Sequence, residues 1–190
     1  MPADPEALLN DEVLITPHGE MPWQPYWAQA WEASMGLCEH LVTLPLAGQV
    51  VLDLGCGIGL TSALLAAQGA TLTCGDNAIP SLVFAEINTW PWRDNVQVAL
   101  IDWHKTNLSQ RFDWIVGSDI VYDRKEVPPL DRFFRAHLAE QGRVLLSDPC
   151  RAMTREFLNL FSELGWQVDI EFMDNPHAKN RTRLASLTLA

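Results

Sequence analysis

The chain has 190 residues, of which 48% are hydrophobic and 19% charged, so it is long and apolar enough to bury the core of one domain. Its formal net charge of −11, from 24 acidic and 13 basic residues, disfavours binding to nucleic acid or to anionic membranes, because both interactions depend on Lys and Arg. We expect a single domain over residues 1–190 that binds neither, with an N-terminal arm and helix in 1–44 and the core of the domain in 45–190.

The prolines predict the N-terminal arm, and the spacing of apolar residues predicts the first helix. Five prolines in residues 1–25 indicate an irregular segment, with a short strand expected at Val13–Ile15. From Trp27 to Leu44 the apolar residues recur at helical spacing, and Pro45 ends the pattern.

The core alternates short apolar runs with amphipathic stretches. The runs predict strands at Val50–Leu54, Thr71–Cys74, Val96–Leu100, Trp114–Val116, Val144–Leu146, Gln167–Phe172 and Arg183–Leu189. The stretches predict helices at Thr61–Gln68, Ile79–Trp90, 127–139 and Phe157–Leu164. Repeated strand–helix units predict an α/β fold: a doubly wound, mostly parallel seven-stranded sheet with helices on both faces. The last two strands have no helix between them, so they predict an antiparallel C-terminal hairpin.

Targeting signals and cysteines indicate the compartment. The acidic, proline-rich start of the chain differs from a signal peptide. The uncharged stretch 54–75 contains five glycines and changes from a strand pattern to a helix pattern, so we predict that it does not span a membrane. The four cysteines have no metal-ligand spacing: Cys38, Cys56, Cys74 and Cys150. We expect them to be reduced thiols, which places the chain in the cytoplasm, and we expect no metal.

The most informative stretch is Asp53-Leu54-Gly55-Cys56-Gly57-Ile58-Gly59, which follows a predicted strand and opens a predicted helix. Glycines there let the backbone turn sharply and approach a ligand closely. A dinucleotide-binding loop requires a glycine where this chain has Leu60, so the spacing disfavours a pyrophosphate. The acidic residue two positions before the first glycine suits a cofactor that carries an amine and a carboxylate.

Acidic residues also follow the second and third predicted strands. Asp76 stands where a carboxylate accepts hydrogen bonds from both hydroxyls of a ribose, although it also suits a helix N-cap. After the third strand, Asp102 could bind the exocyclic amine of an adenine while Trp103 flanks the base, and the alternative for Trp103 is packing at the surface. The carboxyl ends of these strands meet at one edge of the sheet.

The fourth predicted strand ends in Ser118-Asp119-Ile120-Val121-Tyr122 at the same edge. Asp119 could accept hydrogen bonds from a substrate amine, and Tyr122 could form a wall of the pocket. The alternative is an Asp helix cap beside a half-buried Tyr. No Ser-His-Asp set, HExxH motif or paired-cysteine site competes with this interpretation.

With these motifs the sequence resembles class I methyltransferases of Rossmann-like fold, and more narrowly the seven-strand protein-lysine methyltransferase group, which includes predicted nicotinamide N-methylases. The resemblance covers about Val13 to Leu189 and includes Trp27-Ala28-Gln29-Ala30-Trp31-Glu32 and the D-x-x-Y element formed by Asp119 and Tyr122. It implies S-adenosylmethionine as cofactor, with S-adenosylhomocysteine as product. It implies cofactor-binding roles for Trp31, Asp53, Gly55, Cys56, Gly57, Gly59, Asp76, Asn77, Asp102, Trp103 and Ser118, and catalytic roles for Asp119 and Tyr122.

The resemblance leaves the acceptor open. Protein-lysine N-methylation is the leading hypothesis, with a monomeric enzyme and a lysine-bearing protein as partner. Methylation of a small amine or nicotinamide-like ring is the alternative, and a cofactor-binding protein without catalysis is a third. The stretch Asp148-Pro149-Cys150-Arg151 resembles the branch that acts on an electron-transfer flavoprotein subunit, with Cys150 at a position where glycine is expected.

Overall fold

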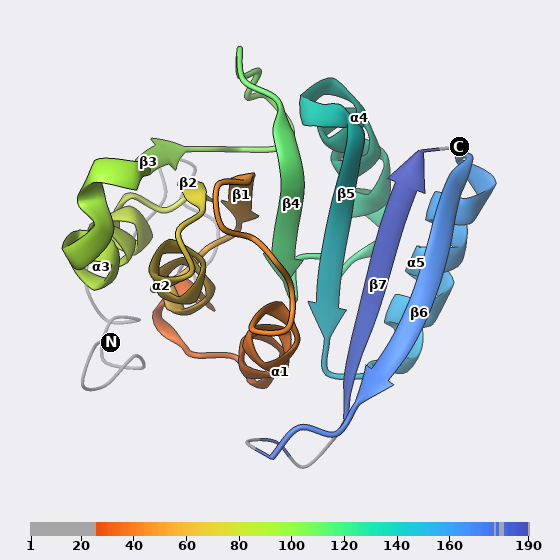
Figure 1. Cartoon of the computed structure of the whole chain (residues 1–190). Coiled ribbons are helices and arrows are strands. Elements are labelled where there is room, and N and C mark those ends of the chain that lie inside the picture. Colours follow the sequence, from red (N-terminus) through yellow and green to blue (C-terminus); the bar gives the residue numbers. More distant parts are fainter. Residues whose placement is uncertain (1–25, 177, 179–180, 190) are drawn as a thin grey trace, which may run out of the picture.

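A seven-stranded sheet in the order β3-β2-β1-β4-β5-β7-β6 forms the centre of the computed structural model, which describes residues 26–176, 178 and 181–189 (Figure 1). The expected strand at Val13–Ile15 lies outside the described residues. The strands are β1 (Val50–Leu54), β2 (Thr71–Asp76), β3 (Val96–Leu100), β4 (Phe112–Ser118), β5 (Leu138–Asp148), β6 (Trp166–Met173) and β7 (Thr182–Leu189). The helices are α1 (Glu32–Leu41), α2 (Leu60–Ala67), α3 (Ile79–Thr89), α4 (Val127–His137) and α5 (Ala152–Glu163), with 3₁₀ turns η3 (Tyr26–Ala28), η4 (Trp90–Asn95) and η5 (Arg124–Glu126).

The direction of the strands confirms the expected fold. Strands β1 to β5 pair in parallel, and β7 runs antiparallel between β5 and β6. The chain builds β1, β2 and β3 outwards in one direction and then returns to place β4 on the other side of β1. The loops after β1 and β4 therefore diverge, and such a reversal leaves a crevice at the carboxyl edge of the sheet.

Two hydrophobic clusters hold the helices on opposite faces of the sheet (Figure 1). Neighbouring residues of a strand point to opposite faces, so Val51 joins the cluster that includes residues of α1, α2 and α3, while Leu52 joins the cluster that includes residues of α4 and α5. Both side chains are fully buried. Burial on both faces explains why the central strands appear in the sequence as continuous apolar runs.

Several element boundaries differ from the sequence prediction, and two of these differences have a clear structural cause. The helix expected from Trp27 to Leu44 is η3 followed by the shorter α1, because Trp31 has an extended backbone and its indole donates to the carbonyl of Tyr26 at 2.9 Å. The helix expected over 127–139 ends at His137, because Leu138 is extended and pairs with Phe112 as the first residue of β5. The apolar run in the sequence marks only part of this longer strand.

None of the described helices is long and apolar enough to cross a membrane. Residues 54–75 form the end of β1, the glycine-rich loop, α2 and most of β2.

Candidate functional site

A cavity of about 700 Å³ opens at the carboxyl ends of β1, β2 and β4, the edge where ligands bind in open α/β sheets. Most of the residues proposed from the sequence line it: Trp31, Asp53, Gly55, Cys56, Gly57, Asp76, Asn77, Trp103, Ser118, Asp119 and Tyr122. Gly59 and Asp102 do not line it. Among the residues lining the cavity, Arg151 is the one with a charged side chain that the sequence analysis had not assigned to the site.

The glycine-rich loop after β1 closes against β2 and against the chain before α1. The amides of Gly55 and Cys56 donate to the carbonyl of Gly75 at 2.8 and 3.0 Å. Gly57 has a φ of 53°, and a Cβ at this position would lie 3.2 Å from the carbonyl oxygen of Trp27. A side chain at Gly57 would therefore strain the loop and push apart two segments that line the cavity.

Gly59, to which the resemblance assigns a cofactor-binding role, lies outside the cavity lining and packs against a neighbouring helix. It precedes α2 with a φ of 80°, and a Cβ there would lie 2.7 Å from the Cα of Ala85 in α3. The glycine allows α2 and α3 to approach each other behind the loop.

Asp76, the last residue of β2, fixes the loops on both sides of it. Its carboxylate accepts from the amide of Gly57 at 2.9 Å and from the amide of Ala78 at 3.0 Å. Burial raises the pKa of Asp76, and the hydrogen bonds from these backbone amides oppose that rise. Each oxygen keeps a lone pair, so the carboxylate can still accept from a ligand's hydroxyl groups.

Asp53 is a buried carboxylate in β1 that also lines the cavity. The hydroxyl of Ser62 in α2 donates to it at 2.5 Å. Burial raises the pKa of Asp53 to about 7, and the hydrogen bond from Ser62 lowers it only in part. A cationic group in the cavity would favour the ionised form of Asp53.

The loop after β3 brings one of its two predicted residues to the cavity. Trp103 lines it, and its indole donates to Glu126 of η5 at 2.8 Å. Asp102 instead accepts from the amide of His104 at 2.9 Å and pairs with Lys105 at 3.1 Å. Its carboxylate stabilises its own turn, a local arrangement that Asp favours after a strand, and so it does not reach the cavity.

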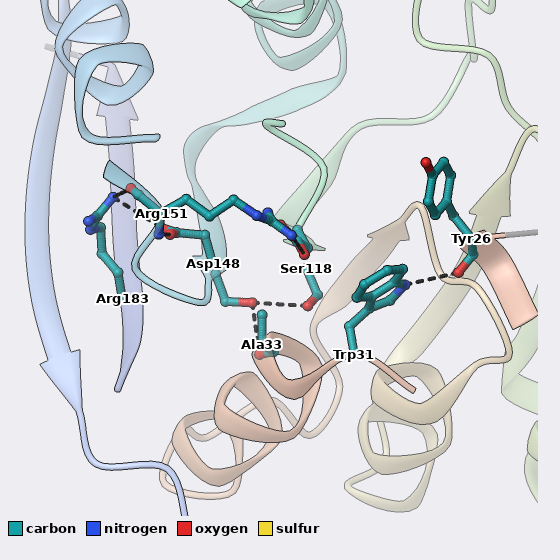
Figure 2. Close-up of polar contacts among 9 residues, drawn as sticks. Tyr26, Trp31, Ala33, Ser118, Asp148, Arg151 and Arg183 are labelled. Carbon is teal, nitrogen blue, oxygen red and sulfur yellow. Dashed lines mark hydrogen bonds and ion pairs between the residues drawn. The ribbon is translucent and has the colours of Figure 1, made fainter. Parts of the chain in front are cut away.

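Residues before α1 form another wall. The Trp31 indole donates to the backbone carbonyl of Tyr26, and the rings of the two residues have their centroids 6.1 Å apart (Figure 2). Both residues line the cavity. The sequence analysis did not assign Tyr26 to the site, and its position depends on the break before α1.

At the end of β4, Asp119 is held in an unusual backbone conformation with a φ of 57°. Its amide donates to the carbonyl of Ser147 in β5 at 2.8 Å, and the preceding Ser118 hydroxyl lies 3.1 Å from that of Ser147. Both oxygens of Asp119 accept from the guanidinium of Arg151, with the Nη2–Oδ2 distance at 2.7 Å. Figure 2 shows the Arg151 side chain extending from the segment before α5 towards the end of β4.

Tyr122 lies on the outer side of this end of the cavity. Its side chain is 56% exposed, and desolvation together with the charge of Glu126 raises the pKa of its phenol. It remains a neutral, accessible ring at the mouth of the cavity.

The donor and acceptor groups at the β1–β2 side fit the expected cofactor. Asp76 offers acceptors for ribose hydroxyls, and Asp53 offers a carboxylate that has no cationic partner among the described residues. Trp27 also lines the cavity, and its buried indole N–H has no hydrogen-bond partner among them. Within the same residues no group of three or more His, Cys, Asp or Glu side chains could hold a metal ion.

Comparisons with known proteins agree on one family. The family model described as "Methyltransferase domain" matches residues 26–188. The chain is 30% identical over 158 residues to protein N-lysine methyltransferase METTL21A of Xenopus tropicalis, covering 77% of this chain and 65% of that protein. It is 30% identical over 152 residues to the electron transfer flavoprotein beta subunit lysine methyltransferase of Homo sapiens, covering 73% of this chain and 58% of that protein.

The solved structures show the same fold. The crystal structure of the glycopeptide N-methyltransferase MtfA complexed with S-adenosyl-L-homocysteine aligns with a TM-score of 0.72 and 14% identity, covering 82% of this chain and 87% of that one. The chain thus spans a little under two thirds of the lysine methyltransferases it matches, and most of the MtfA structure.

Proposed function

The chain belongs to the methyltransferase domain family, whose methyl donor is S-adenosylmethionine, and from this premise we propose that it methylates the side-chain nitrogen of a lysine in a protein. The family match and the fold confirm the expected resemblance to class I methyltransferases. The acceptor is inferred from the site and from the names of the curated relatives.

The observation that supports this proposal best is that one cavity has two different ends. We call the side with Asp53 and Asp76 the cofactor end, and the side with Asp119, Tyr122 and Arg151 the acceptor end. When bound, S-adenosylmethionine supplies a methyl group on a positively charged sulfur, so the protein has to position the acceptor and exclude water rather than activate a leaving group. A carboxylate at the acceptor end suits a nitrogen nucleophile, because it accepts hydrogen bonds from N–H groups and so orients the lone pair.

The charge of the chain is compatible with a lysine-bearing partner. The net charge of −11 attracts cationic surfaces. A free lysine has a pKa of about 10.4, so the acceptor end must bind the neutral amine or favour loss of its proton before attack. We further propose that the protein is a monomer and that it is cytoplasmic; its four free thiols are compatible with a reducing compartment.

The test is methyl transfer from radiolabelled S-adenosylmethionine into a cell lysate that is then separated into protein and small-molecule fractions. We expect label in protein, released after acid hydrolysis as methylated lysine, and much less label with the Asp119→Asn variant. Label confined to the small-molecule fraction would replace the lysine proposal with a small-amine acceptor. Cofactor binding with no labelled product in either fraction would indicate a binding protein without catalysis.

A further inference from the structure

Arg151 is already paired with Asp119, the carboxylate that the sequence analysis expects to bind the acceptor amine. Its two terminal nitrogens contact both oxygens of Asp119, a fork-like pairing that leaves no oxygen of Asp119 without a cationic partner. An acceptor amine cannot take the same position while this pair is formed. The side chain of Asp119 is only 8% exposed in this state.

The backbone that carries Arg151 is held by two hydrogen bonds, whereas its side chain is partly exposed. The Arg151 amide donates to the carboxylate of Asp148 at 3.0 Å, and its carbonyl accepts from Arg183 at 3.3 Å (Figure 2). Asp148 and Arg183 form a buried ion pair at 3.4 Å beneath this turn. The Arg151 side chain is itself 42% exposed, so its guanidinium can turn outwards into water while the turn keeps its shape.

The two partners of the Arg151–Asp119 pair thus differ in what they lose on separation. The guanidinium would gain water at the cavity mouth, whereas the Asp119 carboxylate would remain in the cavity and need another donor. The charged groups that face Arg151 are Asp119 and, farther away, Asp148, which is already paired with Arg183. Exchange of Arg151 for another cation at Asp119 therefore disturbs no second ion pair.

We propose that Arg151 pairs with the Asp119 carboxylate while no acceptor is bound, and that it releases this carboxylate when the acceptor's amino group binds. The inference rests on the proposed amine acceptor. Because the binding-competent state is then only a fraction of the population, the apparent affinity for any amine is reduced by that fraction. A free small amine must overcome this reduction with one contact, whereas a lysine on a protein adds the contacts of the surrounding surface. Arg151 thereby lowers the occupancy of the site by weakly binding small amines, although the same fraction applies to both acceptors and leaves the ratio of their affinities unchanged.

The test compares how tightly the unmodified protein and its variants bind n-butylammonium, a lysine side-chain analogue. Binding is measured by calorimetry in the presence of saturating S-adenosylhomocysteine. The Arg151→Met variant keeps the aliphatic stem and removes the charge, and we expect it to bind n-butylammonium about tenfold more tightly than the unmodified protein. Arg151→Lys, which keeps a cation, should show a smaller gain. The matched control is Arg124→Met, because Arg124 pairs with Glu156 at 3.5 Å on the surface and does not line the cavity. It should change nothing.

A second variant tests whether the gain depends on Asp119. The double change Arg151→Met with Asp119→Asn should lose the increased affinity, while thermal unfolding checks that each variant is folded. Unchanged, weaker or undetectable binding by Arg151→Met would overturn the proposal and make Arg151 a residue that positions Asp119. This readout requires no turnover, so it separates the role of Arg151 from the lysine proposal: tighter binding without labelled protein in the lysate would refute the latter alone.

Discussion

At the cofactor end, Asp53 and Asp76 are buried and accept hydrogen bonds from groups fixed by the adjoining loop and helices, whereas at the acceptor end Asp119 is paired with the half-exposed side chain of Arg151. Backbone amides are part of the fold and cannot move without unfolding the loop. A guanidinium on a long side chain can move away. The cofactor end is therefore preorganised, and the acceptor end can be rearranged by a ligand.

The backbone conformation also differs between the cofactor end and the acceptor end. The cofactor loop makes its left-handed turns with glycines, which adopt positive φ without steric cost. At the acceptor end Asp119, directly after β4, has a φ of 57°, and Cys150, two residues after the end of β5, has a φ of 61°. This conformation costs an L-residue roughly 1–2 kcal/mol. The comparison shows strain concentrated where the acceptor is proposed to bind, as is common at functional sites.

The substitution Asp119→Asn should have the largest effect of those considered, and it tests whether the two ends of the cavity have different roles. The change keeps the size of the side chain but removes the charge that aligns the acceptor, and we expect single-turnover methyl transfer to slow by about 10²-fold, the scale of other losses of positioning. Cofactor affinity, measured by calorimetry on the same sample, should change little. Equal loss of both would place Asp119 at the cofactor end, and normal turnover would leave the acceptor site elsewhere.

The reciprocal change at the cofactor end is Asp76→Ala. It removes acceptors for the ribose hydroxyls, a loss of ~1.5–3 kcal/mol or about 10- to 100-fold in cofactor affinity. It also leaves the amides of Gly57 and Ala78 without their partner, so the free energy of unfolding should fall. Asp76→Asn keeps one oxygen acceptor and should lose less of both. A folded Asp76→Ala protein with unchanged affinity would contradict the assignment.

The raised pKa of Asp53 predicts that cofactor affinity depends on pH. Since this carboxyl has a pKa of about 7 and the cofactor's ammonium favours its ionised form, binding should release protons near and below pH 7. Affinity should fall as the pH falls below 7, by at most about tenfold per unit, and level off above it. Calorimetry between pH 5.5 and 7 measures this slope, and Asp53→Asn should flatten it. The same slope in the variant would assign the dependence to another group.

The smallest expected effect concerns the strain at Cys150. Replacing it with glycine should raise the free energy of unfolding by about 0.5–1 kcal/mol, because relief of the left-handed conformation exceeds the added entropy of the unfolded chain. Cys150→Ala keeps the Cβ and should not be stabilised. Chemical denaturation of the two variants side by side measures the difference. A more stable alanine variant would show that the thiol, rather than the backbone, is unfavourable.

The sequence predicted the cofactor end more fully than the acceptor end. The positions of the strands along the chain, the glycine-rich loop and Asp76 depend on local signals: apolar runs, glycine spacing and the residues that end a strand. The placement of Asp53, Asp76 and Asp119 around one cavity follows from parallel strands meeting at one edge of the sheet.

The features of the site that the sequence analysis did not predict depend on the direction of side chains and on contacts between distant segments. Asp102 has the expected position, but its carboxylate bonds its own turn. Arg151 is 32 residues from Asp119, and only the adjacency of β4 and β5 brings them together. The signal that could have found it is a cation three residues after the fifth strand, at the same edge as Asp119. Cys150, at a position where glycine was expected, was a further signal of the strained turn.

The central claim is that the two ends act separately, and a double-mutant cycle on Asp76→Asn and Asp119→Asn tests it most directly. Cofactor affinity and the single-turnover rate at saturating cofactor are measured for both single variants and the double variant. We predict that Asp76→Asn lowers the affinity, that Asp119→Asn lowers the rate, and that the effects add within about 0.5 kcal/mol, as expected for sites without shared partners. A coupling energy well above that value, or a cofactor affinity that falls equally in both single variants, would contradict the division of the cavity.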